Sequence, residues 1–230
     1  EAMKSLVWRT LADVNDLEIG GGGRGQAHKL TAASILFAGE ACNRVLNKAV
    51  QVHGGSGYIC MALPFVELAD GGKRNATKWW GDVAETKRYC IATVREVCRR
   101  FGGDPRRVVL MGFSRGAIAC SYLGLHDDEI AQLWCGLLAH SHFEGEFRHP
   151  ASDENSWRER LRRLNGRPLF ISQEASTQKT EAALAGAGIS GDITFAVLPY
   201  PNHSARWVLC DVPLRATARR WLQRATQVRP

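Results

Sequence analysis

One serine stands between two glycines in residues 112–116, which read Gly-Phe-Ser-Arg-Gly and follow the pattern Gly-x-Ser-x-Gly. A valine-rich stretch with strand character, residues 107–111, leads into it, and a helical pattern starts at Arg115. A strand that turns into a helix within one or two residues strains the backbone at the serine, and flanking glycines give it room. The Ser114 hydroxyl would then project at the carboxyl end of the strand, where it could attack an electrophilic carbon.

A serine hydroxyl is a weak nucleophile until a base takes its proton, so a histidine is needed nearby. His203 comes shortly after the last apolar stretch with strand character, residues 193–198, and we expect it to be that base. His140 and His142 flank Ser141 after an earlier strand and could be metal ligands. No third ligand stands at a familiar spacing. We therefore interpret both as loop residues lining or near the pocket.

A carboxylate is needed to orient the imidazole of the base. Glu174 follows the strand predicted at residues 169–172, and we expect it to be this acid. Ser176 occupies the position where an aspartate is more usual, and Asp192 is a remote alternative because it precedes the final strand. The backbone amide of Arg115, at the start of the helix, is the predicted donor to an oxyanion.

The elements that must position these residues alternate between strands and helices from residue 62 onward. This alternation predicts an α/β fold with a largely parallel sheet and helices on both faces. Residues 1–59 differ, because two helical patterns are joined by the glycine-rich segment 20–25, which predicts an α-helical hairpin. No strand precedes that segment and no Lys-Ser/Thr pair comes after it, so a phosphate-binding loop is not expected.

Residues 101–114 read Phe-Gly-Gly-Asp-Pro-Arg-Arg-Val-Val-Leu-Met-Gly-Phe-Ser. They resemble α/β-hydrolase esterases of the polyhydroxyalkanoate-depolymerase and feruloyl-esterase kind, which carry an Asp-Pro-x-Arg-Val turn, a strand and then Gly-x-Ser-x-Gly. The resemblance extends over residues 62–230. It implies a serine hydrolase that cleaves a small-molecule carboxylic ester with the triad Ser114, His203 and Glu174, and that needs no cofactor.

Residues 63–68 would be the fourth strand of that fold, and its first three strands then have no counterpart in the sequence. The strand leading to Ser114 is accordingly expected to have an open edge. The second oxyanion donor, which should come from the loop after the third strand, is missing too. Its loss costs about 3–4 kcal/mol of transition-state stabilisation, so we expect weak activity or none.

Residues 49–58 read Ala-Val-Gln-Val-His-Gly-Gly-Ser-Gly-Tyr and resemble a segment of the C-terminal helical domain of acyl-CoA dehydrogenases. In that family the segment lies against the FAD of a neighbouring subunit, so the resemblance implies FAD contacts at Gln51, Gly54 and Gly55. The family's Arg-Asp pair and catalytic Glu do not follow, and two helices cannot enclose a flavin. We interpret residues 1–59 as a dehydrogenase-like helical fragment, a natural fusion or an artificial joint near Cys60, and do not expect FAD-linked oxidation.

The composition is that of an ordinary globular protein, with 45% hydrophobic and 23% charged residues among 230. The net charge is +7, but the arginines are interspersed with Glu and Asp and no nucleic-acid motif accompanies them, so we expect no nucleic-acid partner. No apolar run approaches the length of a membrane span. Seven cysteines without paired spacing favour a reducing, cytoplasmic compartment. Because the chain starts at Glu1 rather than Met, a missing export signal stays open.

Two other functions stay open at this point. The chain could be a dehydrogenase-derived fragment with no activity of its own. It could also be a hydrolase-like binding module without catalysis, and that reading gains if Glu174 points away from His203.

Overall fold

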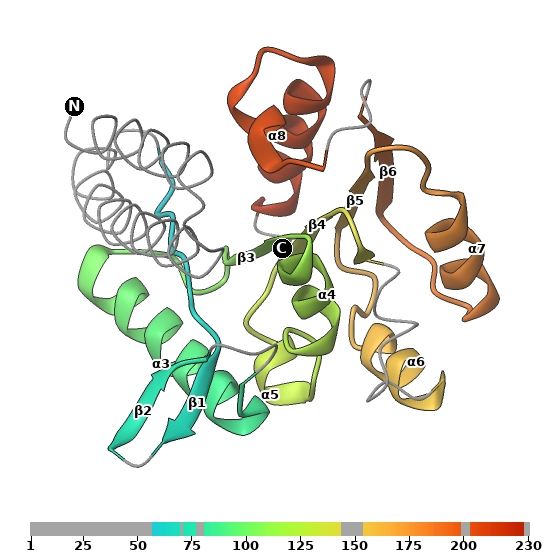
Figure 1. Cartoon of the computed structure of the whole chain (residues 1–230). Coiled ribbons are helices and arrows are strands. Elements are labelled where there is room, and N and C mark those ends of the chain that lie inside the picture. Colours follow the sequence, from blue (N-terminus) through green and yellow to red (C-terminus); the bar gives the residue numbers. More distant parts are fainter. Residues whose placement is uncertain (1–56, 70, 77–80, 144–153, 199–202, 228–230) are drawn as a thin grey trace, which may run out of the picture. The chain divides into compact units, whose positions relative to one another are not determined.

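The computed structural model describes residues 57–69, 71–76, 81–143, 154–198 and 203–227 (Figure 1). The chain divides into two compact units, Glu1–Ala62 and Leu63–Pro230. The predicted helical hairpin and its proposed FAD contacts Gln51, Gly54 and Gly55 lie outside the described residues. The sheet, its helices and the residues expected to do chemistry all belong to the second unit.

The second unit is built around a parallel sheet of four strands in the order β3-β4-β5-β6. The strands are β3 (Val109–Phe113), β4 (Gly136–His140), β5 (Leu169–Gln173) and β6 (Ile193–Val197). Neighbours in the sheet are also neighbours in the sequence, and every pair runs parallel. The carboxyl ends of all four strands therefore lie side by side, along what we call the carboxyl edge of the sheet. The predicted α/β fold with a parallel sheet is confirmed.

Helices precede, connect and follow these strands. They are α3 (Val83–Phe101), α4 (Arg115–Tyr122), α5 (Asp128–Ala131), α6 (Glu154–Arg162), α7 (Gln178–Gly186) and α8 (Pro213–Ala225), with the short 3-10 helix η3 (Ala205–Leu209) before α8. The longest, α3, begins where the Asp82 carboxylate accepts a hydrogen bond from the Glu85 amide at 2.8 Å. It ends at Gly102, whose φ of 74° is left-handed. An aspartate before the first turn and a left-handed glycine after the last are favoured residues at helix ends.

The two faces of the sheet are covered unequally. Leu137 and Ala139 of β4 face one side and belong to a large core that also includes residues of α3, α4, α5, α6 and α7. Leu138 points to the other side, where it belongs to a smaller core with Trp207 of η3 and Trp221 of α8. Figure 1 shows α8 across the sheet from α3 and α4. Helices therefore cover both faces, but among the described helices α8 alone, with η3, covers the second face.

The first strand, β1 (Val66–Ala69), does not join the parallel sheet. It pairs antiparallel with β2 (Gly72–Asn75) in a hairpin, so the assignment of residues 63–68 as a fourth strand of the sheet is wrong. Strand β2 begins at Gly72, whose φ of 114° is a value that glycine adopts readily. Thr86 ties the hairpin to α3, because its hydroxyl accepts from the Val66 amide at 2.9 Å and lies 3.2 Å from the Val66 carbonyl.

Strand β3, which leads to Ser114, is at the edge of the sheet. Among the described strands it pairs with β4 alone. The side chain of Met111, in the middle of β3, is 51% exposed. The open edge expected for this strand is thus found in the described part of the chain.

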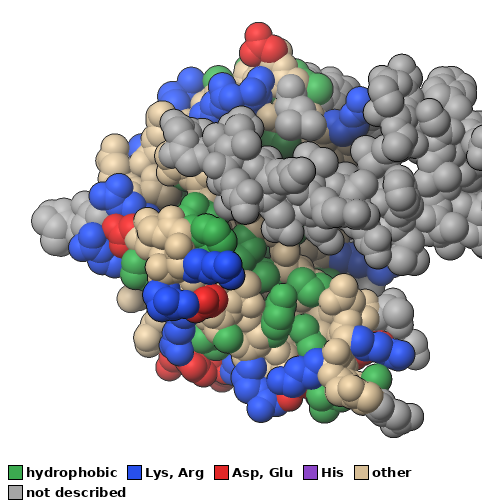
Figure 2. All heavy atoms as spheres, turned by 90° about the vertical axis from the view of Figure 1, so that its left-hand side faces the viewer, with side chains coloured by type: hydrophobic (Ala, Val, Ile, Leu, Met, Phe, Trp, Pro, Cys, Tyr) green, Lys and Arg blue, Asp and Glu red, His purple; other side chains and the backbone are tan. Residues whose placement is uncertain are grey.

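The charged side chains form local pairs. Arg99 lies 2.6 Å from Glu96 on α3, Arg106 lies 3.0 Å from Asp104 in the turn after α3, and Arg74 lies 2.7 Å from Glu67 in the hairpin. On the face shown in Figure 2, basic and acidic side chains are interspersed outside the grey region. No helix in the described ranges is both long and apolar enough to span a membrane.

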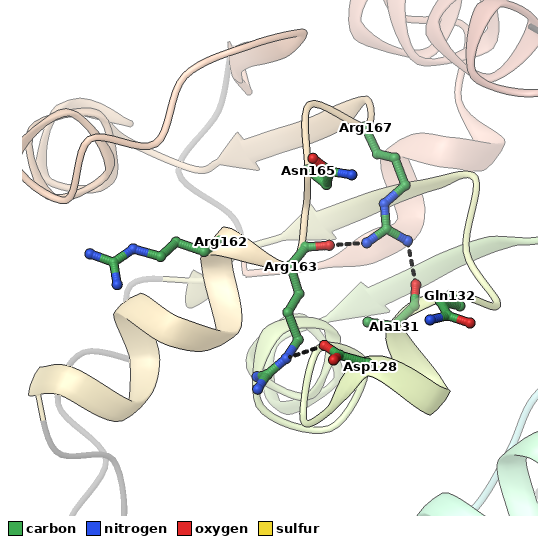
Figure 3. A pocket seen from close by; sticks show the side chains of 7 residues that line it. All are labelled: Asp128, Ala131, Gln132, Arg162, Arg163, Asn165 and Arg167. Atoms are coloured by element: carbon green, nitrogen blue, oxygen red, sulfur yellow. Dashed lines mark hydrogen bonds and ion pairs between the residues drawn. The ribbon is translucent and has the colours of Figure 1, made fainter.

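A hollow between α5 and α6 is held together by arginine (Figure 3). The Arg167 guanidinium donates to the carbonyls of Ala131, Trp134 and Arg163, and its Nε donates to the carbonyl of Leu164 at 2.8 Å. Arg163 donates to Asp128 at 2.9 Å. Arg163 also donates to the carbonyls of Leu125 and His126 at 3.1 Å, so both arginines satisfy carbonyls at helix and loop ends and hold the loops around the hollow in place.

Replacing Arg167 by Met should lower the free energy of unfolding by about 1–3 kcal/mol, because it leaves several partly buried carbonyls without a donor. Arg162→Met is the matched control, since Arg162 borders the same hollow with its side chain directed outward (Figure 3), and its effect should stay within about 0.5 kcal/mol. Urea denaturation of both variants measures the difference. Equal losses in the two variants would contradict this role of Arg167.

Candidate active site

Ser114 occupies a sharp turn between β3 and α4. Its backbone has φ 55° and ψ −116°, a conformation that costs a residue other than glycine roughly 1–3 kcal/mol. The Ser114 amide donates to the His140 carbonyl at 3.0 Å, which continues the β3–β4 pairing past the end of β3. The strained turn predicted for this serine is therefore present.

The two flanking glycines have different roles. A Cβ on Gly112 would lie 2.1 Å from the carbonyl oxygen of Gly116, a distance that only a backbone shift could relieve. A Cβ on Gly116 would meet nothing within 4 Å outside its own helix. The expectation that both glycines leave room for the turn thus holds at Gly112, while Gly116 contributes only the backbone against which Gly112 packs.

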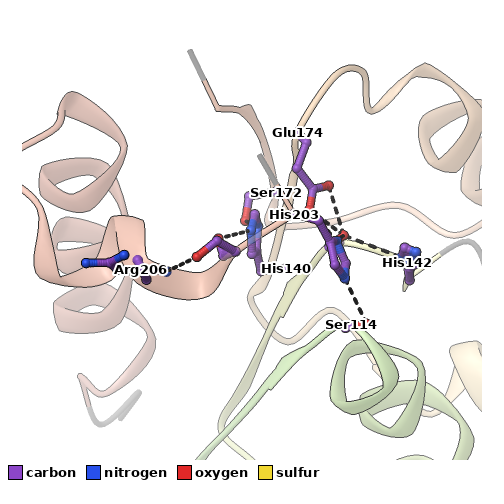
Figure 4. Close-up of polar contacts among 9 residues, drawn as sticks. Ser114, His140, His142, Ser172, Glu174, His203 and Arg206 are labelled. Carbon is purple, nitrogen blue, oxygen red and sulfur yellow. Dashed lines mark hydrogen bonds and ion pairs between the residues drawn. The ribbon is translucent and has the colours of Figure 1, made fainter. Parts of the chain in front are cut away.

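Three residues predicted for the site lie in hydrogen-bond contact (Figure 4). His203 Nε2 is 3.1 Å from Ser114 Oγ, and His203 Nδ1 is 2.8 Å from Glu174 Oε1. They come after the ends of β3, β5 and β6, so the parallel sheet brings them to one edge. The His203 side chain is 49% exposed and that of Glu174 is 16% exposed, which leaves the serine–histidine end open to a ligand.

The two alternative positions for the acid are elsewhere. Asp192 precedes β6, at the other edge of the sheet, and pairs with Arg224 at 3.8 Å. The Ser176 hydroxyl accepts from the Gln178 amide at 3.2 Å, near the start of α7. Asp192 is therefore ruled out as the partner of His203 in this structure.

Glu174 is held as a carboxylate. Its burial alone would raise its pKa, but hydrogen bonds from Ser141 and His203, together with its own backbone amide, outweigh this and hold the pKa below its usual value. A charged Glu174 accepts from a proton on His203 Nδ1, and the lone pair of Nε2 then faces Ser114. This tautomer is the one that a general base for Ser114 requires.

Ser141 also belongs to the site, although no role is predicted for it from the sequence. Its hydroxyl lies 2.7 and 2.8 Å from the two carboxylate oxygens of Glu174 and 3.0 Å from His203 Nδ1. The only indication in the sequence is its position, directly after β4 and therefore at the same sheet edge as Ser114 and Glu174.

Of the two histidines interpreted as loop residues, His142 agrees with that interpretation and His140 does not. His142 comes just after β4, and its ring is 4.7 Å from the His203 ring, so it does lie beside the site. His140 is the last residue of β4 and is buried. Among the described residues, no group of three or more His, Cys, Asp or Glu side chains is arranged to hold a metal ion.

His140 links the sheet to the segment that carries His203. Its Nδ1 lies 2.9 Å from Ser172 Oγ, and its Nε2 lies 3.2 Å from the carbonyl of Ser204, the residue after His203. Burial is the main cause of a lowered His140 pKa. A neutral ring can accept from the Ser172 hydroxyl while its Nε2–H donates to Ser204, so His140 fixes the backbone next to His203.

Arg115, the predicted oxyanion donor, is the first residue of α4. Amides in the first turn of a helix point out of its N-terminus, and the helix dipole adds positive potential there. The position of Arg115 directly after Ser114 fits the role expected for its amide.

Comparison with models of known protein families finds no match, and no curated protein matches the chain either. The class of the protein is therefore set by its own fold and site. It is an α/β protein with a parallel sheet flanked by helices, and a serine, a histidine and a glutamate are hydrogen-bonded in series at the carboxyl edge of that sheet.

Gly112→Ala should destabilise the protein by about 3 kcal/mol or more, at the upper end of overpacking costs, because the new methyl group meets rigid backbone. Gly116→Ala should leave the free energy of unfolding unchanged or raise it by up to about 1 kcal/mol, as alanine favours a helix. Urea unfolding curves of the two variants test this. Similar stabilities in the two variants would contradict a stability cost from the contact between a Cβ at residue 112 and the Gly116 carbonyl.

Acid should weaken the fold through His140. Because its folded pKa lies below the ordinary value of 6.5, its contribution to stability is complete above pH 6.5 and is lost as pH falls toward the folded value. His140→Asn should lower stability at neutral pH and make the fall between pH 7 and 5 shallower. Thermal unfolding midpoints across this range measure the slope, and an unchanged slope in the variant would contradict the assignment.

Proposed function

We propose that this protein is a serine hydrolase of the α/β-hydrolase type that cleaves a small-molecule carboxylic ester, with weak turnover because the second oxyanion donor has no counterpart in the sequence. The observation that carries the proposal is the series of contacts from Ser114 through His203 to Glu174, at 3.1 and 2.8 Å. The order of the three along the chain, serine then acid then histidine, is the order of the α/β-hydrolase fold. The esterase-like segment that ends at Ser114 supports an ester as the substrate.

In the proposed reaction His203 Nε2 takes the proton of Ser114 as Oγ bonds to the acyl carbon, and the carbonyl oxygen becomes an oxyanion. The Arg115 amide at the start of α4 stabilises this oxyanion. His203 then gives its proton to the leaving alcohol oxygen, and an acyl-serine remains. Water attacks the acyl carbon with His203 again as base, which releases the acid and returns the proton to Ser114.

Glu174 keeps its charge throughout these steps. Its carboxylate stabilises the imidazolium that forms when His203 holds two protons. The lowered pKa of Glu174 suits this role, since a carboxyl that stays ionised can compensate a transient positive charge. No step requires a cofactor.

The alternative of a binding module without catalysis rests on a Glu174 that points away from His203. The contact of 2.8 Å between them favours the hydrolase. The alternative of a dehydrogenase-derived fragment rests on Gln51, Gly54 and Gly55, which lie outside the described residues, and no observation of the second unit favours it.

A fluorophosphonate probe should label the wild-type protein on Ser114, because the probe reacts with a serine whose proton is removed by a base. Ser114→Ala should abolish labelling, and His203→Ala should slow it by about 10²–10⁴-fold. Gel fluorescence and mass spectrometry of the labelled peptide provide the readout.

The control is Ser176→Ala, which removes an exposed hydroxyl close to Glu174 and should label like the wild type. A wild-type protein that resists the probe, or label that remains in Ser114→Ala, would falsify the proposal. An absorbance spectrum of the same preparation bears on the dehydrogenase alternative, since bound flavin would colour the protein yellow.

A further inference from the structure

The backbone around Ser141 is strained in a way that fixes its side chain. Ser141 and His142 have φ values of 64° and 61°, and two consecutive residues other than glycine in this region cost roughly 1–3 kcal/mol each. The Ser141 amide donates to the Ser172 carbonyl at 2.8 Å, which extends the β4–β5 pairing by one residue. The side chain is 1% exposed, so its hydroxyl cannot exchange its partners for water.

The Ser141 hydroxyl has one proton to donate and several polar atoms around it. The two oxygens of Glu174 lie at 2.7 and 2.8 Å, His203 Nδ1 at 3.0 Å and His142 Nδ1 at 3.4 Å. The carboxylate is the only charged acceptor among them, so it receives the proton. The oxygen of Ser141 then faces the proton on His203 Nδ1 as an acceptor, next to Glu174 Oε1.

We propose that Ser141 is a positioning residue of the hydrolase, which orients the Glu174 carboxylate and holds the proton of His203 on Nδ1. The role rests on the proposed function, because it acts through the base of Ser114. Without the hydroxyl, Glu174 can rotate about its last torsion, and Nδ1 loses one of two acceptors. The unprotonated form of His203 then populates the tautomer whose Nε2 carries the proton, and this tautomer cannot take a proton from Ser114.

Because the backbone at residue 141 is left-handed, substitutions there can distinguish a need for the hydroxyl from a need for stability. Glycine adopts φ 64° without the steric cost that serine pays, so Ser141→Gly relieves strain while it removes the hydroxyl. Ser141→Ala removes the hydroxyl and keeps the strain. If Ser141 served stability alone, Ser141→Gly would be at least as stable as the wild type and would keep its kcat.

The test compares Ser141→Gly and Ser141→Ala with the wild type and with Ser121→Ala. Ser121 is also buried, but its hydroxyl donates to the Ile118 carbonyl on α4. Both Ser141 variants should lose about 10- to 100-fold in kcat for a p-nitrophenyl ester with KM unchanged, the loss expected for one hydrogen bond to a charged group. Ser121→Ala should keep the wild-type kcat.

A second readout reports on the imidazole itself. The ring ¹⁵N shifts of His203, assigned by their loss in His203→Gln, should indicate protonated Nδ1 in the wild type and a mixture of tautomers in Ser141→Gly. A glycine variant that keeps kcat within twofold, or the same ring shifts as the wild type, overturns the proposal. Because the shifts need no activity, they test Ser141 even if the fluorophosphonate probe shows that Ser114 is not a nucleophile.

Discussion

The close packing of Gly112 against the backbone of Gly116 is the constraint on which the site depends. It lets β3 turn into α4 at a single residue, and that residue is Ser114. A wider turn would carry the hydroxyl away from the end of the sheet and out of reach of His203. The energy stored in the Ser114 backbone is offset by the surrounding packing, because the strand before the turn and the helix after it are both anchored in the same core.

The parallel sheet brings the other residues of the site to this turn. Ser114 and His203 are 89 residues apart in the chain, and Glu174 and His203 are 29 apart, yet each comes after a strand whose end lies at the same edge. Behind these residues, polar contacts run from the buried Ser172 and His140 to the half-buried Ser204. The buried, neutral His140 thus limits the movement of the exposed His203 through its contact with Ser204.

Much of this arrangement can be predicted from the chain. The alternation of apolar stretches and helical patterns locates all four strands of the sheet. Strand β3 begins two residues after the predicted start at residue 107. Strand β4 begins three residues into the apolar stretch that starts at Leu133, because Leu133 and Trp134 pack in the core without joining the ladder. The pattern also predicts that β1 belongs to the sheet, which is wrong, since a few apolar residues do not reveal their partner. Ser141 is not predicted because its role depends on a backbone conformation that its residue type does not indicate.

The uneven cover of the sheet has a consequence for how the C-terminus can be handled. Among the described elements, only η3 and α8 shield Leu138 and Phe170, and they do so with two large indoles, those of Trp207 and Trp221. Deleting the chain from Pro213 onward would expose that apolar layer to water and remove the helix that packs against β6, the strand before His203. Helix α8 is thus an integral part of the domain, and affinity tags or fusions placed after it need a spacer beyond Ala225.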